Sequence, residues 1–174
     1  MQSALGWIGD LVTWIVNFLP HLEVIMKTHA GVKFVRGRKT KVLEPGMHWY
    51  WPITSIIVTA PVVRQSLQLD GQTLTCADGK CVYISTVMVY SIHDIHEALV
   101  QTWDFDETIE DIAQKCTASR VAEYDRDFLL SHIEDFSADL LEWIEDRLTA
   151  YGVTLISVGI VDLAAVRAYR FVTN

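Results

Sequence analysis

The sequence predicts an α+β fold, a mostly antiparallel sheet with helices on one side, preceded by an N-terminal membrane-associated helix. Three observations lead to this prediction. Residues 3–19 are almost entirely apolar. Residues 32–92 contain apolar runs and alternating segments separated by turn signals, as strands do. From Asp94 onward apolar residues recur at helical spacing, and a last strand follows at residues 153–163, so we expect helices packed on one face of a sheet.

The N-terminal apolar run predicts a helix in the membrane interface, because its few polar residues form one narrow stripe on a helix. At about 1.5 Å per residue the run spans roughly 25 Å, less than the hydrocarbon core of about 30 Å. A straight span would also place Asp10 near the bilayer centre at a cost of about 3 kcal/mol. An in-plane or re-entrant helix that turns back at Pro20 avoids both difficulties. The side chains expected to enter the lipid are Trp7, Ile8, Leu11, Trp14, Ile15, Phe18 and Leu19.

Two other interpretations of this run stay open. A secretory signal peptide needs a basic start and a small-residue cleavage site, and neither precedes Pro20. A helix in a soluble core would explain the apolar residues but not the basic cluster that follows them. This cluster consists of Lys27, Lys33, Arg36, Arg38, Lys39 and Lys41. Such clusters are typical of the cytoplasmic side and attract anionic head groups, so we expect the main domain in the cytoplasm.

The 174 residues suffice for one domain and a terminal anchor. We assign residues 1–22 to the membrane helix, 23–168 to the domain and 169–174 to a C-terminal tail. The net charge is −8, and sixteen acidic residues lie between Asp94 and Asp146. An acidic body would repel phosphate, which argues against nucleic-acid binding. The acidic surface either contacts basic residues of a neighbouring copy or is a solvated helical face.

The middle of the chain predicts strands. A first hairpin is expected at residues 32–43, interrupted by residues 37–40, and Pro45 with Gly46 marks the next turn. Residues 53–60 are apolar and rich in β-branched side chains, which favours a further strand.

A second hairpin is predicted around Asp78 and Gly79, a dipeptide typical of a two-residue type I′ turn. Both faces of its second arm, residues 80–92, are largely apolar, so we expect that strand to be covered on both sides. A two-residue turn would place Cys76 opposite Cys81, where a cross-strand disulfide is geometrically possible. Free thiols are expected in a reducing cytoplasm, and a metal site would lack two ligands.

Two main helices follow. Asp104 and Glu107 predict the cap of the first, and Ser131 and Glu134 repeat the same spacing before the second, which ends at Gly152. The expected apolar stripes are Phe105, Ile109, Ile112 and Cys116 in the first helix and Ile133, Phe136, Leu140, Ile144 and Leu148 in the second.

Several of these features, taken together, resemble one family. Residues 45–52, which begin with Pro-Gly and end with Pro52, look like the Pro-Gly, five residues, Pro signature of the SPFH or band 7 family, which includes stomatin, prohibitin and flotillin. The second hairpin, the residues 90–94 at its end, the helix that contains Arg120 and the ending at residues 151–163 follow in the family's order. The resemblance covers roughly residues 23–168.

The resemblance implies a membrane-attached, non-enzymatic scaffold that forms large homo- or hetero-oligomeric rings or cages and organises lipids, channels or membrane proteases, with no cofactor. The family normally continues through a proline into a long helix, whereas here Ala164 replaces the proline and the sequence stops at Asn174. We therefore expect a ring held by domain contacts and the membrane, or a smaller assembly. The alternative is a peripheral adaptor or inhibitor that binds a longer SPFH protein or a membrane protease.

Two further groups of residues each allow two interpretations. His93, Asp94 and His96 are residue types found in metal-dependent hydrolases, and the competing interpretation is that Asp94 caps a helix. We predict no catalytic and no metal site. Trp49 and Trp51 would point the same way in a strand. The family resemblance suggests that this edge faces the bilayer, so both could enter the head-group layer, and the competing interpretation is packing in the core.

Overall fold

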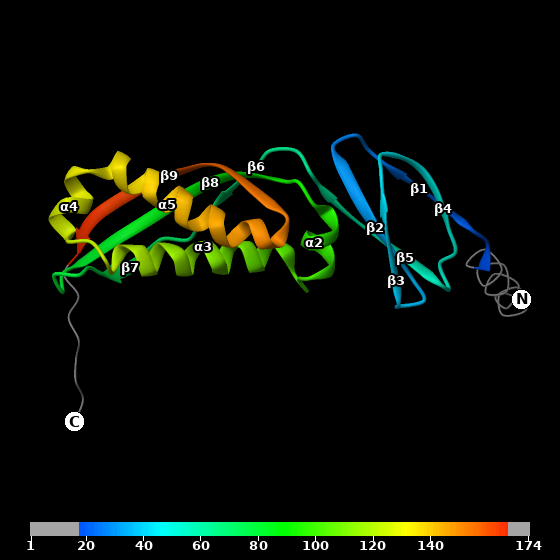
Figure 1. The fold of residues 1–174 in the computed structure, drawn as a ribbon, viewed down its shortest axis with the longest axis horizontal. Coiled ribbons are helices and arrows are strands. Elements are labelled where there is room, and N and C mark those ends of the chain that lie inside the picture. Colours follow the sequence, from blue (N-terminus) through cyan, green and yellow to red (C-terminus); the bar gives the residue numbers. More distant parts are fainter. Residues whose placement is uncertain (1–17, 167–174) are drawn as a thin grey trace, which may run out of the picture. The chain divides into compact units, whose positions relative to one another are not determined.

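The computed structural model describes residues 18–166, which form two compact units divided between Val63 and Arg64 (Figure 1). Each strand pair recorded in these residues joins two strands of the same unit. The assignment of residues 23–168 to one domain stays a prediction, and within this region the chain forms the two compact units. No flexible-linker composition marks the division, because residues 61–64 contain neither glycine nor serine. The predicted tail at residues 169–174 lies outside the described part of the chain.

Unit 1 is built from antiparallel strands. A two-stranded ribbon pairs β1 (His21–Ile25) with β4 (Gly46–Tyr50). A three-stranded sheet has the order β3-β2-β5, with β2 at His29–Val35, β3 at Lys39–Leu43 and β5 at Ser55–Pro61. The predicted hairpin, the turn before β4 and the strand after it are thus confirmed.

The β2–β3 hairpin turns at Arg36 and Gly37, which have φ angles of 51° and 63°. Two consecutive positive φ angles are the signature of a type I′ turn. The Arg38 amide donates a hydrogen bond to the Val35 carbonyl across it, at 3.2 Å. The turn is therefore tight, and β3 begins at Lys39, earlier than the sequence predicted.

Unit 2 contains an antiparallel sheet whose central strand is β8 (Cys81–Ile92). Strands β6 (Gln65–Gln68) and β7 (Gln72–Thr75) pair with different halves of β8. Strand β9 (Val153–Val166) pairs along the whole length of β8, so it lies at the opposite edge from the two short strands.

Helices α2 (Ile95–Val100), α3 (Phe105–Val121), α4 (Arg126–Ser131) and α5 (Ile133–Leu148) and the short 3-10 helix η1 (Thr149–Tyr151) connect β8 to β9. Figure 1 shows α3 and α5 side by side over one face of the sheet, and the predicted α+β arrangement is confirmed. The side chains of β8 buried on this face are Val82, Ile84, Thr86, Met88, Tyr90 and Ile92. The opposite face is only partly covered, since Tyr83, Val87 and Val89 are half-buried, which corrects the prediction that both faces are covered.

Local patterns predicted most helix features. The carboxylate of Asp104 accepts a hydrogen bond from the Glu107 amide at the start of α3, as expected. The apolar side chains buried along α5 are Phe136, Leu140, Ile144 and Leu148. The predicted cap at Ser131 is wrong, because its hydroxyl donates to the Asp127 carbonyl at 2.8 Å and closes the separate helix α4. Ile133, expected in the buried stripe, is exposed.

Candidate membrane-binding site

One face of the β1–β4 ribbon consists of exposed apolar side chains. In the antiparallel register Leu22 lies opposite Trp49 and Val24 opposite Met47. Strand side chains alternate, so these four residues share one face, which we call the apolar ribbon face. Their exposed fractions are 44% for Leu22, 60% for Val24, 70% for Met47 and 65% for Trp49. Contiguous exposed apolar pairs are typical of an interaction site, whereas single exposed apolar residues are ordinary.

The other face of the ribbon contacts the three-stranded sheet of the same unit. Ile25 is buried at the end of β1, and a Cβ atom added at Gly31 would lie 3.0 Å from its Cδ1 atom. Glycine in β2 therefore lets the ribbon pack closely on the sheet. The rings of His21 and Tyr50 also lie together on this face, 5.9 Å apart. The apolar ribbon face is thus the outer side of a ribbon whose inner side is fixed.

Trp51 follows the ribbon in a turn that several hydrogen bonds hold. Its carbonyl accepts from the amides of Thr54 and Ser55 and from the Ser55 hydroxyl, at 2.9–3.1 Å. Its ring meets that of Phe18 edge-on, with 6.0 Å between the centroids. Trp51 is 41% exposed and Trp49 65%, so the competing interpretation that both are core residues is wrong.

Further exposed apolar side chains adjoin the ribbon in the sequence. Phe18 and Leu19 precede β1 and Met26 follows it, and each is more than half exposed. Lys33 reaches across from β2, where its Nζ atom donates a hydrogen bond to the Trp49 carbonyl at 3.0 Å. A small pocket of about 340 Å³ lies at this contact, lined in part by Lys33, Trp49 and Trp51. The predicted aromatic residues therefore gather with one of the predicted cations.

The other predicted cations lie on loops and on the β2–β3 hairpin. Lys27 follows β1, and Arg36, Arg38, Lys39 and Lys41 occupy the end of the hairpin, where all four are exposed. In residues 18–166 none of these four makes an ion pair with a carboxylate.

The predicted N-terminal helix falls mostly outside the described residues. Trp7, Ile8, Leu11, Trp14 and Ile15 all belong to residues 1–17, so their membrane insertion stays a prediction. Residues 21 and 22, which the sequence assigned to that helix, belong to β1. Across residues 18–166 no helix has the length and hydropathy needed to cross a membrane.

Comparison with known proteins decides the family. The family model described as SPFH domain / Band 7 family matches residues 23–170, which includes the apolar ribbon face apart from Leu22. The chain belongs to the SPFH domain / Band 7 family. Membership supports a general role as a membrane scaffold, and it confirms the resemblance seen in the sequence.

Three relatives of this band 7 protein show how far the likeness extends. An uncharacterised protein of Archaeoglobus fulgidus is 22% identical over 157 residues, which are 90% of this chain and 63% of the relative. One of Methanocaldococcus jannaschii is 22% identical over 149 residues, 82% of this chain and 75% of the relative. A protein named as a band 7 family protein in Acanthamoeba polyphaga mimivirus is 20% identical over 139 residues, 80% of this chain and 46% of the relative. The chain spans between about half and three quarters of these relatives.

Sequence analysis missed three members of the band 7 protein's apolar ribbon face. Leu22, Val24 and Met47 were not predicted as site residues. The alternation of polar and apolar residues in His21–Ile25 is a strand signal, but it follows the N-terminal apolar run directly and was assigned in part to that helix. The pairing of Leu22 with Trp49 and of Val24 with Met47 depends on the β1–β4 register, which joins residues far apart in the sequence.

The cysteine pair of this band 7 domain is not arranged as predicted. Thr75, not Cys76, lies opposite Cys81. The Cys76 amide instead donates a hydrogen bond to the Lys80 carbonyl, and only Gly79 in the turn has positive φ, so the loop has three residues. This register puts Leu74 beside Val82 on the helix-covered face, whereas a two-residue loop would put Leu74 opposite Tyr83. The structure has Cys76, Cys81 and Cys116 as free thiols.

We expect Cys81 to be alkylated first when the folded protein is treated with iodoacetamide near pH 8. Burial raises the pKa of the Cys76 thiol, helped by the charge of Asp78, and burial also raises the pKa of Cys116. Cys76 and Cys116 therefore carry a smaller fraction of the reactive thiolate form than an ordinary exposed cysteine does, and both are buried. Cys81, in contrast, is partly exposed to the reagent. Mass spectrometry of peptides at successive times measures the order, with unfolded protein as the control. A Cys76–Cys81 disulfide in non-reduced samples would contradict the structure.

The His93 and Asp94 pair of the band 7 domain serves a structural role. The Asp94 carboxylate accepts hydrogen bonds from the amides of His96 and Glu97, at 2.9 and 3.3 Å, and so caps α2. The ring of His93 lies 3.1 Å from the hydroxyl of Thr154 on β9. The capping interpretation made from the sequence is confirmed.

Proposed function

We propose that this chain is a non-enzymatic scaffold that attaches to a membrane through unit 1 and assembles with itself into large ring-like oligomers. The apolar ribbon face is the single observation that supports this proposal most strongly. Four apolar side chains there are 44–70% exposed, and moving such surface out of water is favourable by about 25 cal/mol per Å². A bilayer interface accepts tryptophan readily, and the family membership independently supports a membrane role.

Electrostatic attraction would add to this attachment. The exposed cations of the β2–β3 hairpin, which belong to the same unit and form no ion pair within residues 18–166, suit the anionic lipids of a cytoplasmic leaflet. Each Lys or Arg near such a surface contributes about 1 kcal/mol. The proposal therefore places the protein on the cytoplasmic side, where it would organise lipids or membrane proteins such as channels and proteases.

Negative-stain electron microscopy of the full-length protein in mild detergent tests self-assembly. We expect uniform large particles, because a scaffold assembles without a partner. A variant that lacks residues 1–17 keeps β1 intact and shows how much the N-terminal segment contributes. Small dispersed particles from the full-length protein, at concentrations well above those in cells, would contradict the scaffold and favour an adaptor that requires a host assembly.

A further inference from the structure

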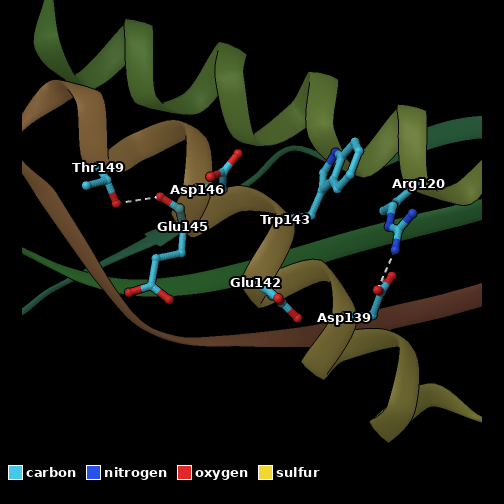
Figure 2. A pocket seen from close by; sticks show the side chains of 7 residues that line it. All are labelled: Arg120, Asp139, Glu142, Trp143, Glu145, Asp146 and Thr149. Carbon is cyan, nitrogen blue, oxygen red and sulfur yellow. Dashed lines mark hydrogen bonds and ion pairs between the residues drawn. The ribbon is translucent and has the colours of Figure 1, made fainter.

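A pocket on helix α5 is lined by four carboxylates and one indole ring (Figure 2). Its volume is about 580 Å³. The residues that line it are Arg120 from α3 and Asp139, Glu142, Trp143, Glu145, Asp146 and Thr149 from α5 and its C-terminal end. The pocket is thus strongly acidic, with an aromatic surface at its centre.

The cations near the pocket are already engaged. Arg120 pairs with Asp139 and Glu123, and its guanidinium carbon lies 4.6 Å from the centroid of the Trp143 ring. Arg147 stacks on the same ring at 3.9 Å. Figure 2 shows the Arg120–Asp139 contact within the pocket. The two guanidinium groups therefore hold Trp143 in place and leave other pocket carboxylates without a cation.

Glu142 and Glu145 are these free carboxylates, since neither forms an ion pair with any residue in the described range 18–166. Asp146 reaches only Arg147, at 3.9 Å. The uncompensated charges of Glu142 and Glu145 therefore suit the cationic side chains of a partner.

The β2–β3 hairpin has the complementary chemistry. Its exposed end carries Arg36, Arg38, Lys39 and Lys41, the four cations that form no ion pair with any other described residue. A Cβ atom added at Gly37 would meet no other atom within 4 Å, so the space beside this glycine is open.

We propose that the β2–β3 hairpin end of one copy docks in the α5 pocket of a second copy, with Arg36, Arg38 and Lys39 facing Glu142 and Glu145. This inference rests on the self-assembly proposed above and names the contact that would carry it. Each copy has one hairpin end and one pocket, so the contact is heterologous and repeats from copy to copy, as a ring requires. Charge complementarity of this kind directs the encounter and fixes the register of the partners.

Charge reversal on either side tests the contact in the full-length protein in detergent. The hairpin variant is R36E/R38E/K39E and the pocket variant is E142K/E145K. A control variant, D111K/D162K, makes the same charge change as the pocket variant at exposed positions of unit 2 outside the pocket. Mass photometry at low and at high salt measures particle size. We expect each reversed variant alone to lose the large particles, and the control to keep them.

An equal mixture of the two reversed variants is expected to restore the large particles, because the acidic hairpin of one fits the basic pocket of the other. Restoration also shows that both variants fold. If the wild-type protein forms large particles and the reversed variants keep them, or if the mixture restores nothing, the hairpin–pocket contact is overturned while self-assembly stands. If the wild-type protein forms no large particles, self-assembly itself fails. High salt should weaken the wild-type assembly, since it screens exposed charges.

Discussion

Replacing both Met47 and Trp49 by serine is expected to weaken binding of the full-length protein to anionic vesicles by about 30- to 150-fold. The two side chains are 70% and 65% exposed, so most of their apolar surface is free to enter lipid. We expect each substitution to remove about 1 to 1.5 kcal/mol of the free energy of vesicle binding, or about 2 to 3 kcal/mol together. Every 1.4 kcal/mol is a factor of ten in affinity. Flotation with vesicles over a range of lipid concentrations measures the change.

The fold should survive this substitution. Both side chains lie on the exposed face of the ribbon, and Lys33 hydrogen-bonds the backbone carbonyl of Trp49, which serine retains. A matched control replaces Ile156 and Val161 of β9, 38% and 56% exposed, by serine. We expect that control to change vesicle binding by less than about twofold, since it removes apolar surface from unit 2. Equal losses in the two variants would show that the ribbon has no special role.

Gly152→Ala is expected to lower the free energy of unfolding by about 2 to 5 kcal/mol. Gly152 has φ of 72°, and a Cβ atom there would lie 2.3 Å from the backbone oxygen of Asp94. The left-handed backbone costs about 1 to 2 kcal/mol with a side chain, and the forced shift costs about 1 to 3 kcal/mol more. The shift cannot be local, because the Gly152 carbonyl accepts hydrogen bonds from the amides of His93 and Asp94. Urea unfolding followed by circular dichroism measures it.

Gly79→Ala separates the cost of the left-handed backbone from the cost of the steric contact. Gly79 has a similar φ of 75°, but a Cβ atom there would meet no atom within 4 Å. Only the backbone cost remains, about 1 to 2 kcal/mol. The predicted order is therefore a larger loss at Gly152 than at Gly79, and equal losses would mean that the close approach to Asp94 is not tight in solution.

Local patterns allowed most of unit 2 to be predicted. The spacing from Phe136 to Leu148 fixed the buried side of α5, and the side chain of Asp104 fixed the start of α3, because both signals lie within a few residues. The register of the second hairpin could not be read in the same way. The Asp78-Gly79 dipeptide suits two- and three-residue loops alike, and only the longer loop puts half-buried Leu74 beside buried Val82 on the same face.

The candidate site was predicted only in part. Trp49 and Trp51 were found from their aromatic run and the family resemblance, but Leu22 and Val24 join them only through the β1–β4 pairing. The division after Val63 was missed for a related reason. The strands before Val63 and those after it form separate sheets, and this follows from strand pairing, which the sequence does not show. Neither glycine nor a charge run marks the boundary in the sequence.

Membrane attachment through unit 1 is tested most directly by the depth of Trp49 in a bilayer. A variant with Trp49 as its only tryptophan has phenylalanine at positions 7, 14, 51, 103 and 143. Bound to anionic vesicles that contain brominated phospholipids, its fluorescence should shift to shorter wavelength and be strongly quenched, because the indole enters the head-group and upper acyl region. Full vesicle binding with unshifted and unquenched Trp49 emission would show that the protein attaches elsewhere and would contradict the role of the apolar ribbon face.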